Sequence, residues 1–392
     1  MGLLDTTFRH PALVGAATAL VALVVVALRV EVAGQGHVGN LVLLGSRFVV
    51  PGSHVGVPVV HGNGYDGQFY YRLALDPLDF SPHAQGIVMD SPQRYERVVY
   101  PVLAWTLSAG HASLVPWSLI AVNVVCLGAL GWLGALVARD GGRHPAWGLL
   151  VPAYFGFVWS LSRDLTEIVE CTFIVAGLVA LRRRRPVLCG LALSAAVLSR
   201  ETALVVVACI GLVQLARWLA PGPGAVRRPE SAPASHLTAW VLPVAVFAGW
   251  QGVVRSKIGH LPLLASGQHN LDVPFAGLAR GFSHYAALLP GKSAVLWFGE
   301  LAVLVFVVVT AARHLKTSAA PLHERLAWGA YGVLSLCLAP GIWLGDVGFR
   351  SLDDVYVLSV LVVLASPRRT RVIAPVMGLT WLVVAAELVK VI

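Results

Sequence analysis

Long apolar stretches separated by short polar segments recur along almost the whole chain. About 20 consecutive apolar residues form a helix long enough to cross the hydrocarbon layer of a bilayer. The pattern predicts an all-α, polytopic integral membrane protein with about eleven transmembrane helices, of which the fourth and fifth are short. The predicted spans lie near residues 11–30, 114–138, 145–161, 166–181, 186–199, 201–219, 238–254, 292–312, 326–344, 351–366 and 372–391.

Basic residues in the predicted connections test this topology. If the N-terminus is cytoplasmic, the cytoplasmic segments hold sixteen Arg and Lys residues, whereas the three short outer turns hold only Arg163, Arg200 and Arg350. Cytoplasmic loops of membrane proteins carry such an excess of positive charge. We therefore expect a multi-pass protein of the inner (plasma) membrane, with a cytoplasmic N-terminus, an outer C-terminus and its polar site on the extracytoplasmic face.

The same topology divides the chain into parts. We expect one transmembrane domain over residues 1–392, with a first outer loop at 31–99 and a second at 255–291. Residues 220–236, rich in Pro, Ala and Ser, are predicted to form a cytoplasmic linker. The first apolar run, Leu13 to Val30, is long for the core of a signal peptide, so we interpret it as a retained span.

Composition agrees with a membrane location and excludes several other classes. Hydrophobic residues make up 57% of the chain, charged residues only 12%, and mean hydropathy is +0.74, whereas soluble domains are usually about a quarter charged. The net charge of +9 does not indicate nucleic-acid binding, because the basic residues lie between apolar runs. All five cysteines lie inside apolar runs, and neither they nor the histidines show metal-ligand spacing. We therefore predict no metal site and no cofactor.

The acidic residues concentrate on the predicted outer side. Of the twenty Asp and Glu residues, only Asp5, Asp140, Glu230 and Glu324 fall in predicted cytoplasmic segments. Acids at the edge of a membrane are costly and usually face a cavity or a partner. The outer face is therefore where we expect chemistry.

The densest polar motif is YDGQFYYRLALDP, at residues 65–77 in the first outer loop. It predicts a short helix on the outer membrane surface, beginning near Asp66 and ending at Asp76-Pro77. Asp66 has two interpretations, an ordinary N-cap or a functional carboxylate. Tyr70 would lie one turn further along.

Charged residues also lie in the segment RYERVVYP and in three outer turns. Arg94 and Arg97 in that segment could hold a lipid phosphate, because guanidinium groups match phosphate oxygens, or they could simply meet lipid headgroups. The turns are SRDLTE at 162–167, SRET at 199–202 and GDVGFRSLDD at 345–354. Each alone is consistent with an ion-paired turn, but their common side favours a shared polar cavity.

These motifs, in this order, resemble a group of bacterial polytopic proteins within the GT-C glycosyltransferase superfamily. The likeness covers about residues 60–350 and includes YDGQFYYRLALDP, RYERVVYPVLAW, SRDLTE, LSRETALVV and WQGVVRSKIGHLP followed by NLDVPFAGL. GT-C enzymes transfer a sugar from a polyprenyl-phosphate carrier to a lipid, glycan or protein acceptor at the outer leaflet. A tandem DD or DE is common elsewhere in the superfamily, whereas Asp66 is followed by Gly67.

The resemblance implies a set of roles. An acid of the first outer loop acts as general base, which maps onto Asp66, and we expect inversion and favour mannose as the sugar. Cations at the outer interface would stabilise the phosphate leaving group, and Arg97, Arg200 and Arg350 are the candidates. The rest of the expected substrate cavity consists of Tyr65, Gln68, Tyr70, Arg94, Asp164, Glu167 and Glu201. The expected partners are the lipid-linked sugar, its acceptor and membrane lipids, with no nucleic acid.

Two other classes remain open. A secondary transporter or lipid flippase would have ionisable residues near the membrane midplane and two related halves, but no halves are evident and Glu300 is the one acid predicted well within a span. A non-catalytic cell-envelope scaffold would not need acids and arginines gathered on one face.

Overall fold

The longest apolar runs form long helices in the computed structural model. It describes residues 10–219, 233–264, 270–345, 348–366 and 373–391. Within these ranges, six helices are long and apolar enough to cross a membrane. They are α2 (Pro11–Val32), α5 (Val115–Asp140), α9 (Leu204–Leu219), α10 (Pro233–Ile258), α12 (Lys292–His314) and α16 (Ile373–Val391).

The other five predicted spans form shorter helices, so eleven full-length spans are not found in the described chain. Two of the runs are broken, 145–161 into η6 and α6, and 326–344 into α13 and α14. Every residue of α15 is buried, which fits a short apolar run that packs against protein rather than lipid. These elements are η6 (Pro145–Leu150), α6 (Gly156–Ser162), α7 (Glu167–Arg182), α8 (Pro186–Val197), α13 (Leu322–Leu336), α14 (Pro340–Leu344) and α15 (Asp353–Leu364).

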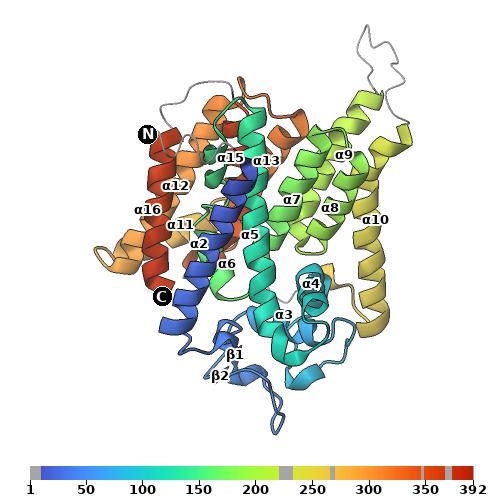
Figure 1. Cartoon of the computed structure of the whole chain (residues 1–392), viewed down its shortest axis with the longest axis vertical. Coiled ribbons are helices and arrows are strands. Elements are labelled where there is room, and N and C mark those ends of the chain that lie inside the picture. The colour runs from blue at the N-terminus through green and yellow to red at the C-terminus, as the bar shows by residue number, and fades with distance from the viewer. Residues whose placement is uncertain (1–9, 220–232, 265–269, 346–347, 367–372, 392) are drawn as a thin grey trace.

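The long helices stand side by side, with α2 beginning at the upper end and α16 ending at the lower end in Figure 1. Small residues bring α2 against α5. A Cβ atom on Gly15 would lie 2.7 Å from the carbonyl oxygen of Gly128, and one on Gly131 would lie 2.3 Å from Oγ1 of Thr18. Such close approach through glycine is typical of helix packing within membranes.

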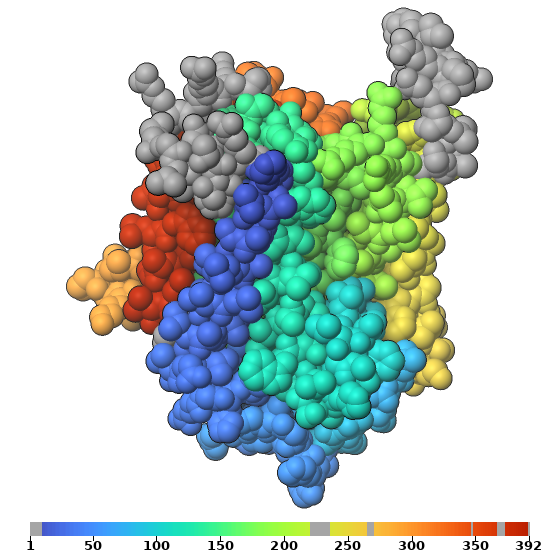
Figure 2. Space-filling model, in the orientation of Figure 1, coloured from blue at the N-terminus to red at the C-terminus, as the bar shows by residue number. Residues whose placement is uncertain are grey.

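The predicted first outer loop folds at the lower end of the helices, where its blue to cyan surface covers that end (Figures 1 and 2). Two short strands, β1 (Leu44–Gly45) and β2 (Val59–Val60), pair in parallel, and two α-helices follow, α3 (Gly67–Leu75) and α4 (Val99–Leu107). The single-turn elements here are η1 (Val38–Leu41), η2 (Ser46–Phe48), η3 (Ala84–Gly86), η4 (Pro92–Glu96) and η5 (Ala112–Leu114).

The remaining connections are also short. The second outer loop contains η8 (Pro262–Leu264) and α11 (Ala276–Ala287), while η7 (Glu201–Ala203) precedes α9 and η9 (Gly348–Leu352) precedes α15. Most of the predicted cytoplasmic linker, residues 220–232, lies outside the described residues.

The predicted helix of the YDGQFYYRLALDP motif is present as α3, but it is buried and does not lie on a surface. All its residues from Gly67 to Ala74 are buried. The following segment folds back over it, and Arg72 anchors that segment by donating to the carbonyl oxygens of Ser81 and Ala84 and to the hydroxyl of Tyr95. This polar motif can be buried because each guanidinium nitrogen of Arg72 donates a hydrogen bond.

Candidate functional site

A cleft of about 1500 Å³ opens among the first outer loop, the turns before α7 and α9, the second outer loop, and the α13–α14–η9 segment. Five arginines and five carboxylates contribute to its lining. They are Arg94, Arg97, Arg163, Arg200, Arg350, Asp66, Asp90, Glu167, Glu201 and Asp354. Nine of the eleven residues predicted for the site line this cleft, and Tyr70 and Asp164 do not.

Asp66 lies at the start of α3, but its side chain does not cap the helix. Its backbone is already helical, and no cap hydrogen bond forms. Instead, Oδ1 accepts a hydrogen bond from Arg94 at 2.9 Å and Oδ2 accepts one from Arg350 at 2.7 Å. Of the two interpretations of Asp66, the geometry therefore favours a carboxylate held in a cleft over an ordinary N-cap.

Gly67 explains why a second acid does not follow Asp66. A Cβ atom at this position would lie 2.3 Å from the carbonyl oxygen of Arg163 and 3.0 Å from that of Val42. Any side chain would therefore force α3 away from the turn that follows α6. The close backbone packing therefore leaves no room for an acidic side chain directly after Asp66.

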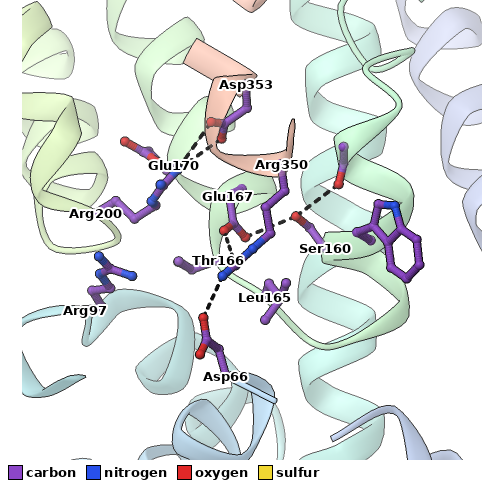
Figure 3. Close-up of polar contacts among 12 residues, drawn as sticks. Asp66, Arg97, Ser160, Leu165, Thr166, Glu167, Glu170, Arg200, Arg350 and Asp353 are labelled. Atoms are coloured by element: carbon purple, nitrogen blue, oxygen red, sulfur yellow. Dashed lines mark hydrogen bonds and ion pairs between the residues drawn. The ribbon is translucent and has the colours of Figure 1, made fainter. Parts of the chain in front are cut away.

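Arg350, from η9, joins three parts of the site. One guanidinium nitrogen donates to Asp66 and the other donates to Glu167 at 2.5 Å, and Ser160 donates to the second oxygen of Glu167 at 3.1 Å (Figure 3). The contact from Arg350 to Asp66 spans 284 positions in sequence. Arg350 thus fixes the first outer loop against α6, α7 and the segment before α15.

Arg94 holds the other side of Asp66. Its guanidinium also contacts both oxygens of Asp90, at 2.9 and 3.0 Å, and stacks over the ring of Phe69 at 4.6 Å. Burial alone would raise the pKa of Asp66, but the charges of Arg350 and Arg94 outweigh it and hold the pKa well below its usual value. Asp66 is therefore ionised at neutral pH.

Arg97 and Arg200, the other two predicted phosphate ligands, are already engaged by acids. Arg97 forms a bidentate pair with Glu201, with distances of 3.0 and 2.6 Å. Arg200 lies between Glu170 at 3.1 Å and Asp353 at 3.3 Å, both fully buried (Figure 3). An anion would have to displace these carboxylates, as it would have to displace Asp66 or Glu167 from Arg350, so none of the three arginines is free for phosphate without an exchange of partners.

Tyr65 and Gln68 line the cleft in different ways. The ring of Tyr65 lies beside two guanidinium groups, 4.3 Å from Arg163 and 5.2 Å from Arg350. Gln68 is almost fully buried, and its amide bonds to the backbone of Gly45 and Asn63. Tyr65 is therefore a candidate contact for a ligand, whereas Gln68 mainly ties β1 to α3.

Two predicted cavity residues lie elsewhere, and their placement corrects the prediction. Tyr70 points into the core beneath the site, where its ring packs edge-on against Tyr100 at 5.6 Å. Asp164 is fully buried at a positive φ of 51°, and neither of its oxygens has a hydrogen-bond partner among the described residues. Burial raises its pKa well above the usual value. The order of residues in a motif does not show which side of a turn or helix each side chain faces.

Several lining residues were not predicted. Arg163 and Asp354 lie in the same outer turns as other residues that were predicted for the site. Their charge and their place in these turns could have identified them from the sequence. One wall of the cleft is apolar, and no motif in the sequence predicted it. It consists of Leu263, Leu271, Leu334, Leu338 and Ile342, from the second outer loop, α13 and α14.

Behind Arg97, Glu96 links the first outer loop to α10 and the second loop. It is 1% exposed, and its Oε2 accepts a hydrogen bond from Gln251 at 2.7 Å. The oxygen of the same amide accepts one from the backbone of Leu263 at 3.3 Å. Burial first, and then the negative charge of Glu201, raise the pKa of Glu96 to about 7.

Comparisons with known proteins identify no relative, since no protein-family model, curated protein or solved structure matches the chain. Function is therefore argued from the cleft itself.

Proposed function

We propose that this protein is a GT-C-type glycosyltransferase that uses Asp66 as general base. It would move a sugar, mannose by preference, from a polyprenyl-phosphate carrier to a lipid or envelope-glycan acceptor with inversion. The observation that carries the proposal is the position of Asp66, a cleft carboxylate held by two arginines and free of any capping role. An acceptor hydroxyl needs such a carboxylate within hydrogen-bond reach to take its proton.

The two walls of the cleft support a lipid-linked donor. Asp66 and the arginines form a charged wall, while Leu271, Leu334 and Leu338 belong to the apolar wall. A polyprenyl phosphate has the same two chemistries, an anionic head and a hydrocarbon tail. A water-soluble nucleotide sugar would leave the apolar wall without a partner.

Arg350 is the best placed of the three predicted phosphate ligands, with Arg163 beside it. Both guanidinium groups lie against the ring of Tyr65, and Arg350 touches the proposed base directly. While Arg350 and Arg94 hold Asp66, that carboxylate is a weak base. A phosphate that draws Arg350 toward itself would raise the basicity of Asp66 at the moment the donor binds.

The proposal places the cleft at the outer leaflet of the plasma membrane. The first outer loop and the start of α10 lie at opposite ends of the helices (Figure 1). The start of α8, which follows Arg184, packs against the start of α10, since a Cβ atom on Gly190 would lie 2.3 Å from the carbonyl oxygen of Thr238. Single cysteines at His54 and Arg184, in a chain freed of its own cysteines, should therefore react differently with a membrane-impermeant maleimide in intact cells. We expect labelling at His54 only, and labelling at Arg184 only would reverse the topology.

The direct test is sugar transfer. Purified protein is incubated with radiolabelled polyprenyl-phosphate sugars and an envelope lipid extract. We expect label to move from at least one carrier into an acceptor, and loss of the transfer when the carrier is replaced by a nucleotide sugar. Transfer from the nucleotide sugar alone would contradict the proposal.

A transporter is the second candidate, because a buried acid pair lies between two long helices. Glu300 of α12 and Glu387 of α16 are 5% and 0% exposed, and their carboxyl groups lie close enough to interact electrostatically where the two helices pack together. Glu387 lies near the end of α16, so the prediction that Glu300 is the one acid well within a span stays as it was. Ionisable residues at such positions often mark transport pathways. Glu300→Gln should leave sugar transfer intact in a glycosyltransferase, whereas proton-coupled uptake lost in this variant would favour transport.

A further inference from the structure

The Arg200 end of the cleft has more acid than base. Arg200 contacts Glu170 and Asp353, and Asp354 lies beside them. Thr202 has one hydroxyl hydrogen, and it donates to Glu170, although Asp354 is also within its reach. Of these three acids, Glu170 and Asp353 contact the guanidinium of Arg200, whereas Asp354 only lies near it. The described residues contain no cluster of acidic, histidine or cysteine side chains arranged to hold a metal ion.

Two adjacent acids at this end face different surroundings. Asp353 is fully buried, pairs with Arg200, accepts from the thiol of Cys171 at 3.6 Å and is absent from the cleft lining. Asp354 is 5% exposed and lines the cleft. Asp353 is satisfied by the protein, whereas Asp354 presents acceptor capacity to whatever occupies the cleft.

The chemistry of this end selects among ligand groups. Three carboxyl groups around a single guanidinium leave it little capacity for a phosphate, so an anionic head is favoured near Arg163 and Arg350 instead. Hydroxyl groups suit Asp354 well, because its carboxyl oxygens accept hydrogen bonds from hydroxyl groups whether or not the acid is ionised. Neutral polar groups nearby fit the same ligand, since Thr202, Ser351 and Tyr331 also line the cleft.

We propose that Asp354 binds a hydroxyl group of the sugar carried by the donor lipid, which makes the Arg200 end of the cleft the sugar subsite. The inference rests on the proposed function, and it orients the donor with its sugar toward Asp354 and its phosphate toward Arg350. Asp354 then determines sugar preference and takes no part in proton transfer.

The test is binding, which does not require turnover. The full-length protein in detergent is titrated with a short-chain polyprenyl phosphate and with the same lipid esterified to mannose or to glucose, using intrinsic tryptophan fluorescence. We expect the wild type to bind one glycosylated lipid about 3- to 10-fold tighter than the bare phosphate, the range expected for one hydrogen bond. Asp354→Asn should lose this preference and keep its affinity for the bare phosphate.

Asp353→Asn is the matched control, because it alters the neighbouring acid that does not line the cleft. Its sugar preference should persist, and Asp354→Ser replaces Asp354→Asn if the latter does not fold. A folded Asp354 variant that keeps the full sugar preference overturns the inference while leaving the proposed function standing. Wild-type protein that binds none of the three lipids overturns the proposed function itself.

Discussion

The two charged clusters of the cleft combine the same residue types in different ways. In one, Asp66 lies between two guanidinium groups, those of Arg94 and Arg350, each of which also contacts a second carboxylate. In the other, the single guanidinium of Arg200 contacts two carboxylates (Figure 3). The Asp66 pairs keep some access to solvent, whereas Glu170 and Asp353 are fully buried. The first arrangement can exchange a partner with an incoming anion, while the second holds the protein together.

Removing Arg200 should give the largest effect on stability. Arg200→Gln leaves two buried carboxylates without their cation, a change that costs about 3–5 kcal/mol. Arg94→Gln breaks contacts whose side chains are 16–24% exposed and should cost about 1 kcal/mol or less. Thermal unfolding of the purified variants in detergent compares them, and equal losses would erase the distinction between the two clusters.

The comparison also shows what could be read from sequence. The acids and arginines of the outer turns were predicted to share a cavity. Ionisable residues at the edge of a membrane are energetically costly and usually face a cavity or a partner. Their pairing was not predictable, since Arg350 and Asp66 lie 284 positions apart and the packing of η9 against α6 decides their contact.

The long helices show the same limit in the fold. Runs such as Pro11–Val32 and Lys292–His314 are apolar over more than twenty residues, and length alone predicts a span. The run at 351–366 was read in the same way, but it contains α15, twelve buried residues enclosed by other helices. Hydropathy measures exclusion from water, and it cannot tell lipid from the interior of the protein.

The stability of the protein should depend on pH through Glu96, whose side chain bonds to Gln251 of α10. Its pKa is raised to about 7 in the folded protein against an ordinary value of 4.5. The unfolded chain therefore releases this proton first, and the contribution of Glu96 to stability falls by about 3 kcal/mol as pH rises from 4.5 to 7 and is constant above. Glu96→Gln should remove this component, as measured by the difference in unfolding temperature between pH 5 and pH 8. A wild-type protein stabilised over the same interval, relative to Glu96→Gln, would contradict the assignment.

Arg350 should give a smaller effect, on donor binding. Arg350→Lys keeps the charge but loses the planar fork, so affinity for a polyprenyl phosphate should fall about tenfold. Arg350→Gln should fall further and also move the acid limb of the pH–rate profile to higher pH, because Arg350 lowers the pKa of Asp66. Arg97→Lys is the comparison variant. If it weakens donor binding more than Arg350→Lys does, the phosphate belongs beside Glu201.

The most direct measurement of the central claim is the transfer rate of Asp66→Asn. Asn keeps the shape of the side chain, and its amide oxygen can still accept a hydrogen bond from Arg94 or Arg350, so the protein should fold, which thermal unfolding checks. A general-base role predicts a loss of about 10²–10⁴ in turnover in any assay where the wild type transfers sugar. Full turnover by a folded Asp66→Asn would contradict the account and move the base to another carboxylate of the cleft.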